Sequence, residues 1–166
     1  MIRRALAATV VAVAAIGTAP VANADPMSDL IGMLPSGYAP DSCRGAKQVP
    51  RSALVALACD EVTGIVPPGK YELFPSLAAL NHQFDVDFHG TVFKPIKCPG
   101  APGIGPGSIT GGSGWAGRLA CGWVGDANNP TFDVMWTNEP RLLWARVHGP
   151  NLIGLMDWFN SEVGPS

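Results

Sequence analysis

The clearest alternation of apolar and polar residues lies in the second half of the chain. Residues 119–124, 131–137 and 142–147 are apolar runs separated by turn-forming and charged residues, which is typical of β-strands. Within 131–137, the apolar positions of one face are Phe132, Val134 and Trp136. Because side chains alternate between the two faces of a strand, we expect this strand to have one buried face.

A helix is predicted after these strands. Asn151 provides its N-cap, and its inner stripe consists of Leu152, Leu155, Met156 and Phe159. The first half of the chain has a similar order of strands followed by a helix. Residues 52–62 and 70–74 predict two strands joined by a Pro-Pro-Gly turn. Ser76 then opens a helix whose apolar stripe is Leu77, Leu80, Phe84 and Phe88.

The two units also match locally in sequence. Leu57-Ala58-Cys59 corresponds to Leu119-Ala120-Cys121. A duplicated strand-strand-helix unit explains this match, and a chance similarity of leucine-rich helices is the alternative. Helices that follow strands and carry one apolar stripe pack on a sheet. We therefore predict an α+β fold, with an antiparallel sheet and both main helices on one face of it.

The remaining segments predict less regular structure. Asp25-Pro26 is typical of a helix start, with Asp25 as the N-cap and Pro26 in the first turn. Residues 38–51 are polar and proline-containing, which predicts a loop. Residues 98–114 are rich in glycine and proline, and we expect a long loop there as well.

Residues 1–24 predict a secretory signal peptide. Arg3 and Arg4 precede an uncharged Ala/Val-rich run, and Ala22-Asn23-Ala24 provides a small-residue cleavage site. The general secretory route and the twin-arginine route both fit this pattern. We expect residues 25–166 to form a single exported domain with no membrane span.

Charge and cysteine content narrow the function classes. The formal net charge is −2, and no stripe of Lys and Arg predicts nucleic-acid binding. An exported chain with four cysteines predicts two disulfides. Pairing Cys43 with Cys59 and Cys98 with Cys121 closes the shortest loops, and we favour it. Zinc binding is the alternative, but no C-x-x-C spacing supports it.

Catalytic motifs are weak in this sequence. The nearest match to a serine nucleophile is Ser113, which lacks the final glycine of the motif, and no phosphate-binding loop fits either. The titratable residues that lie closest together in the sequence are His82, Asp85, Asp87 and His89. They suit either a metal or acid/base site or an ordinary solvated face, and we favour the solvated face.

Aromatic residues provide the candidate binding surface. Trp115 lies in the glycine-rich segment, and Trp144 shares a predicted strand face with Arg146. These three residues are our possible binding site, with core packing or loop anchoring of the tryptophans as the alternative. Asp133, Glu139, Arg141 and Arg146 are also spaced for cross-strand ion pairs.

A series of short motifs spans most of the chain after residue 24. They are Leu34-Pro35-Ser36-Gly37-Tyr38, Cys43, Leu57-x-Cys59, Tyr71-x-Leu73-Phe74 with Ala78-Ala79-Leu80, Cys98-Pro99-Gly100, Trp115, Cys121-Gly122, Val134-x-Trp136-Thr137 and Asp157-Trp158-Phe159. Together they resemble the extracellular sensor-like domains of actinobacterial, especially mycobacterial, serine/threonine protein kinases. The resemblance implies an α+β domain with paired cysteines outside the membrane. The chain shows no kinase domain or membrane span, so we carry no functional residue across.

The sequence therefore predicts a secreted, disulfide-stabilised, non-enzymatic domain that binds an unidentified ligand or partner in the cell envelope or outside the cell. We expect it to need no cofactor. One alternative is a small hydrolase or metal-dependent enzyme that uses His82, Asp85, Asp87 and His89. A structural envelope protein is the other alternative.

Overall fold

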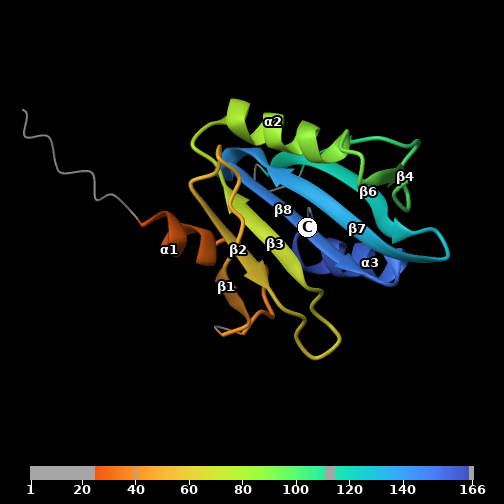
Figure 1. The fold of residues 1–166 in the computed structure, drawn as a ribbon, viewed down its shortest axis with the longest axis horizontal. Helices are drawn as coiled ribbons and strands as arrows, with labels where there is room; N and C mark the ends of the chain where they lie inside the picture. Colours follow the sequence, from red (N-terminus) through yellow and green to blue (C-terminus); the bar gives the residue numbers. More distant parts are fainter. Residues whose placement is uncertain (1–24, 40, 111–114, 165–166) are drawn as a thin grey trace, which may run out of the picture.

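A computed structural model describes residues 25–39, 41–110 and 115–164. The predicted signal peptide and Ser113 lie outside these residues. Figure 1 shows a central twisted sheet with α2 along one border and α3 behind the middle strands. In the described part of the chain, no helix is long and apolar enough to cross a bilayer.

The sheet has eight antiparallel strands, which confirms the predicted fold class. The strands are β1 (Cys43–Gly45), β2 (Val55–Cys59), β3 (Gly69–Leu73), β4 (Lys94–Ile96), β5 (Gly107–Thr110), β6 (Ala116–Asp126), β7 (Asn129–Asn138) and β8 (Leu143–Gly149). Their order is β1-β2-β3-β8-β7-β6-β4, and β5 also pairs with β6. Pairing of β3 with β8 joins the two predicted units into one sheet.

The helices begin where the sequence predicts. They are α1 (Pro26–Ile31), α2 (Leu77–Phe88) and α3 (Leu152–Glu162), with the short 3-10 helix η1 (Glu139–Arg141) before β8. The side chains of Asp25, Ser76 and Asn151 each accept a hydrogen bond from a backbone N–H in the first turn. These bonds satisfy amide groups that have no partner inside the helix, which fixes each starting residue.

The two long helices cover opposite faces of the sheet, and the prediction that they share one face is wrong. Trp136 on β7 packs on α3, with its ring centroid 5.2 Å from that of Phe159. Its neighbour Met135 points the other way and joins the cluster formed by Phe84 of α2 and Trp144. Both faces of β7 and β8 are apolar, so each face needs its own covering helix.

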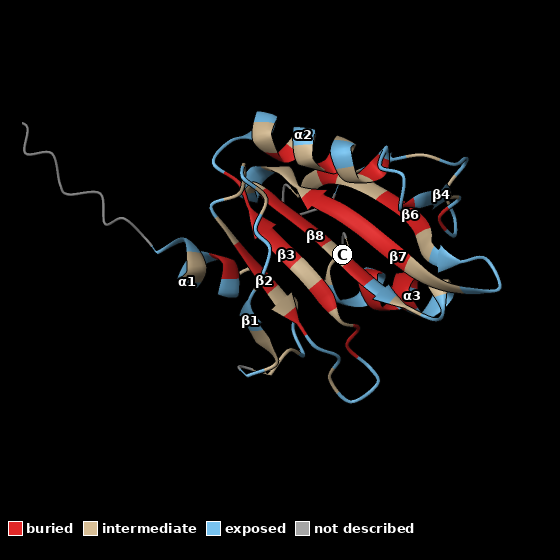
Figure 2. Cartoon of the chain, viewed as in Figure 1, coloured by how far each residue is buried: buried red, intermediate tan, exposed pale blue. Residues whose placement is uncertain are grey.

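The expectation of one buried face for residues 131–137 is wrong for the same reason. Asp133 is 1% exposed, and Met135 and Thr137 are fully buried. Figure 2 shows the buried stretch running along β7 and β8 through the middle of the sheet. Strands in the middle of a sheet that is covered on both sides lose the simple inside-outside alternation.

Two predicted loops contain short strands. The polar segment 38–51 includes β1, and the glycine-rich segment 98–114 includes β5. Strand β4 also lies in a segment for which no strand was predicted, and it carries Pro95. These short edge strands are defined by their pairing with β2 or β6 rather than by an apolar pattern of their own, so the pattern did not reveal them.

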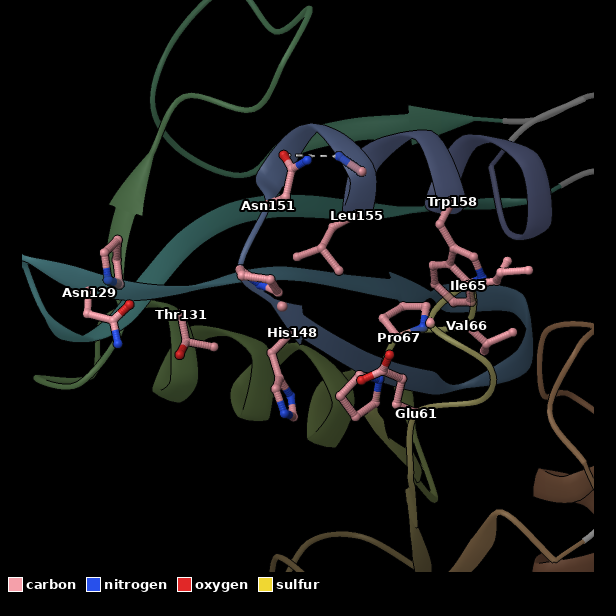
Figure 3. A pocket seen from close by; sticks show the side chains of 16 residues that line it. Glu61, Ile65, Val66, Pro67, Asn129, Thr131, His148, Asn151, Leu155 and Trp158 are labelled. Atoms are coloured by element: carbon pink, nitrogen blue, oxygen red, sulfur yellow. Dashed lines mark hydrogen bonds between the residues drawn. The ribbon is translucent and has the colours of Figure 1, made fainter.

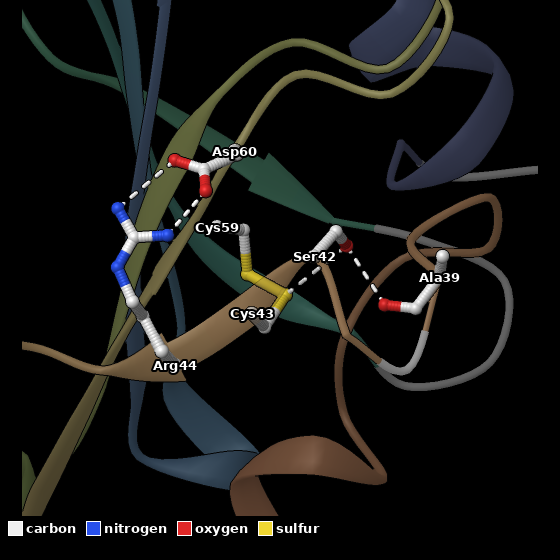
Figure 4. Close-up of polar contacts among 6 residues, drawn as sticks. All are labelled: Ala39, Ser42, Cys43, Arg44, Cys59 and Asp60. Atoms are coloured by element: carbon white, nitrogen blue, oxygen red, sulfur yellow. Dashed lines mark hydrogen bonds and ion pairs between the residues drawn. A yellow bond between two sulfur atoms is a disulfide. The ribbon is translucent and has the colours of Figure 1, made fainter.

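Both predicted disulfides are present. Cys43 and Cys59 face each other across β1 and β2, beside the Arg44–Asp60 ion pair (Figure 4). Cys98 and Cys121 link the segment after β4 to the middle of β6. Such bonds form and persist in oxidising compartments, which is consistent with a protein that works outside the cytosol.

Candidate functional site

The predicted aromatic surface is only partly present. Trp144 is 2% exposed beneath α2 and belongs to the core, so it offers no open aromatic face. Trp115 is half-buried, and its ring centroid lies 6.3 Å from that of Phe159 on α3. A binding role for Trp115 stays a prediction, whereas Arg146 lies in the wall of a cavity described below.

The titratable residues of α2 do not converge. Asp85 pairs with Arg118 at 2.8 Å, and Asp87 accepts a hydrogen bond from Gln83, also at 2.8 Å. His82 and His89 are exposed. Within residues 25–39, 41–110 and 115–164, no group of three acidic, histidine or cysteine side chains is arranged to hold a metal ion. The metal-dependent alternative thus finds no ligand set among these residues.

The part of the sheet that α2 leaves uncovered forms a cavity of about 680 Å³. We call it the polar cavity and define it by Lys70, Gln83, Asp87, Asp133, Trp144, Arg146 and His148. These residues come from β3, α2, β7 and β8. The cavity has the size of many small-molecule sites and contains several converging charged groups.

Strand register brings the charged residues together. Lys70 on β3 lies opposite Arg146 on β8, and Asp133 on β7 lies opposite His148 on β8. Residues two apart on a strand point to the same face, so Glu72 shares the face of Lys70. Antiparallel pairing thus gathers charges that are far apart in the sequence onto one patch.

The patch holds two ion pairs. Arg146 bonds to Asp133, as the predicted spacing of cross-strand ion pairs allows, and Nζ of Lys70 lies 2.5 Å from Oε1 of Glu72. Glu139 and Arg141, which share that spacing, form no ion pair among the described residues. The two carboxylate side chains are each 1% exposed, whereas the basic side chains are 26% and 37% exposed. The carboxylates therefore lie beneath the surface, and the basic groups lie closer to solvent.

Burial governs the ionisation of both carboxylates. Desolvation raises the pKa of Asp133, and the hydrogen bond and charge of Arg146 act in the opposite direction. Desolvation also raises the pKa of Glu72; Lys70 opposes this shift, and the charge of Asp87 adds to it. At neutral pH, keeping these groups ionised costs folding free energy that an apolar interior would not incur.

We predict that Glu72→Gln makes stability less dependent on pH. A carboxyl group whose pKa is raised on folding binds more protons in the folded state, so its contribution to stability falls as pH rises through the folded pKa. The amide has the same shape and carries no charge. The variant should therefore unfold at a higher temperature than the wild type at pH 8, and the difference should shrink toward pH 4.5.

Thermal unfolding followed by circular dichroism at several pH values measures this effect. Glu61→Gln is the control, because Glu61 lies outside the polar cavity and is exposed. A Glu72→Gln variant that is less stable than the wild type at pH 8, with an unchanged pH dependence, would show that ionised Glu72 stabilises the fold.

A second cavity of about 650 Å³ lies around the end of the sheet (Figure 3). We call it the α3 cavity, and its apolar wall consists of Ile65, Val66, Pro67, Pro130, Leu155 and Trp158. The loop between β2 and β3 forms one side of it, and the start of α3 forms the other. Pro68, Thr131 and His148 line both cavities, so the two are adjoining.

Comparisons with protein-family models, with curated proteins and with solved structures found no match. Sequence reasoning identified Arg146 as a candidate but missed Lys70 and Glu72. The available signal was the charged pair inside the apolar strand 70–74, since charged residues in a buried strand need partners.

Proposed function

We propose that the protein is a non-enzymatic domain that works outside the cytosol and binds a small ionised ligand in the polar cavity. The main observation is the ion pair between buried Asp133 and half-buried Arg146 in the wall of an open cavity of about 680 Å³. A desolvated charge with a raised pKa is costly to fold and is common at functional sites. A ligand that uses these charges gives a reason to retain them.

Two further features support this proposal. The disulfides suit an oxidising compartment. Six of the twelve described strands and helices contribute to the cavity wall, and five of these are strands of the disulfide-linked sheet. The resemblance to sensor-like kinase domains supports a ligand-binding role in the same location. A rigid sheet that carries the charged groups keeps them in place for recognition.

A purely structural role for the ion pairs is the competing explanation, and a matched pair of variants separates the two. We predict that Arg146→Lys lowers ligand affinity about tenfold, because lysine keeps the charge but loses the planar fork that holds the carboxylate of Asp133 in position at the cavity wall. Arg141→Lys is the control, since Arg141 is exposed on η1 outside both cavities.

The experiment is a thermal-shift screen of the purified protein with simple amines, carboxylates and phosphate esters, followed by calorimetric titration of the compounds that raise the unfolding midpoint. A ligand at a hundred times its dissociation constant stabilises the fold by about 3 kcal/mol, which such a screen detects. If no compound raises the midpoint, or if both arginine variants bind equally well, the polar cavity is not the binding site.

A further inference from the structure

We infer that the ligand of the polar cavity is an amphiphilic amine, with its ammonium group beside Asp87 and its apolar chain extending past His148 into the α3 cavity. This inference rests on the proposed function, because it specifies the ligand of the same site. It depends on the charge balance of the polar cavity and on the position of the α3 cavity next to it.

The charge balance leaves one acidic group without a basic partner. Lys70 is paired with Glu72, and Arg146 is paired with Asp133. Asp87 also lines the cavity, and among the described residues it makes no ion pair. Its Oδ2 accepts a hydrogen bond from the neutral amide of Gln83. The cavity therefore carries an excess negative charge at its α2 side, which favours a cation.

Glu72 is not among the residues that line the cavity, but it bears on the charge that the ligand should carry. It is fully buried, and its Oε2 has no hydrogen-bond partner among the described residues. Desolvation is the main cause that raises the pKa of Glu72, and the charge of Asp87 adds to it, so the two carboxylates repel each other when both are ionised. An ammonium group next to Asp87 offsets this repulsion, and its N–H groups can donate to Asp87.

The α3 cavity accounts for the apolar part of the ligand. It adjoins the polar cavity at His148, and its wall combines the apolar side chains named above with the polar ones of Glu61, Asn129 and Asn151. Ile65 is 74% exposed at its edge, where water contact is unfavourable for so large an apolar side chain. Figure 3 shows Ile65 and Val66 beside Trp158, with His148 at the side nearer to Thr131. An apolar chain from the polar cavity would cover this surface.

Calorimetric titration with butylamine, hexylamine and octylamine tests the inference, with butanoate, hexanoate and octanoate as the anionic counterparts. We expect the amines to bind at least about tenfold more tightly than the acids. Each methylene that reaches the α3 cavity should raise affinity by about two- to fourfold, which corresponds to partial to full burial of the group.

Two variants separate the contribution of the ligand's ammonium group to affinity from that of its apolar chain. Asp87→Asn should weaken all three amines by about tenfold, whereas Asp157→Asn, at an exposed position on α3, should leave them unchanged. Ile65→Ser should leave butylamine binding unchanged and reduce the extra affinity of octylamine. Ile104→Ser is its control, because Ile104 is similarly exposed, at 69%, and lies outside both cavities.

The outcomes that overturn the inference differ from those that overturn the proposed function. Equal affinity for acids and amines, or amine affinity that does not depend on chain length, contradicts the amphiphilic amine. If another ionised compound nevertheless binds in an Arg146-dependent way, the polar cavity remains the site. Absence of any binding by the amines, acids and phosphate esters contradicts both.

Discussion

Replacing Trp136 with alanine is expected to lower the free energy of unfolding by about 4 kcal/mol. Trp136 is 1% exposed at the centre of β7, where it pairs with Leu119 of β6 and Ala145 of β8. Its ring contacts Tyr71 on β3 and Phe159 on α3 in edge-on geometry. The substitution therefore removes apolar contacts between the sheet and α3 and leaves a cavity that the paired strands cannot close.

Urea denaturation followed by far-ultraviolet circular dichroism measures this loss. Trp115→Ala is the matched control, because Trp115 is only half-buried and contacts α3 from the edge of the same core. We expect the control to lose about 1–2 kcal/mol. Equal losses for the two variants would show that the packing of α3 on β7 does not dominate the stability of this face.

Removal of the Cys98–Cys121 disulfide has the second-largest expected effect. The Cys98→Ala/Cys121→Ala variant should lose about 3 kcal/mol, because the bond closes a loop with a sequence separation of 23 that is rich in glycine and proline. Among the described residues of that loop, the four-residue strand β5 is the only regular element before β6 begins. Without the bond, little else restrains the segment in the unfolded chain.

Equilibrium unfolding with and without a reductant tests this prediction. The control is Cys43→Ala/Cys59→Ala, whose bond closes a shorter loop with a separation of 16. Both sulfurs of the Cys98–Cys121 bond are buried, whereas Cys43 is only half-buried. The Cys98→Ala/Cys121→Ala variant should therefore be the less stable of the two. The opposite order would mean that the anchoring of β1 matters more than that of the glycine-rich segment.

Much of the fold could be predicted from local sequence signals. Asp25, Ser76 and Asn151 mark helix starts because their side chains satisfy amides that the helix leaves open. The apolar runs around Leu57, Ala120 and Val134 correspond to the longer strands. Cysteine spacing gave the correct disulfide pairing, since each bond lies within a local unit.

The placement of the helices could not be predicted from the same signals. An apolar stripe such as that of Phe84 shows that α2 packs on something, but not which face of the sheet it covers. The decisive residues are Met135 and Trp136, which are adjacent, both buried and directed to opposite helices. A run of consecutive apolar residues in a strand was thus the indication of a sheet covered on both sides.

The candidate site was predicted only in part, because it depends on strand register. Arg146 and its pairing with Asp133 followed from spacing along neighbouring strands. Lys70 and Glu72 join them only because β3 pairs with β8, far away in the sequence. The cavity itself exists because α2 ends over the sheet and leaves this patch open, and local sequence patterns do not encode that boundary.

An NMR titration of the isotopically labelled protein tests the binding role of the polar cavity most directly. The probe is the compound from the amine, carboxylate and phosphate-ester screen that raises the unfolding midpoint most. We predict saturable changes in amide chemical shifts at Lys70, Asp87, Asp133 and Arg146, with half-saturation at an about tenfold higher ligand concentration in Arg146→Lys. Changes scattered over the surface, or changes that persist unaltered in that variant, would contradict the account.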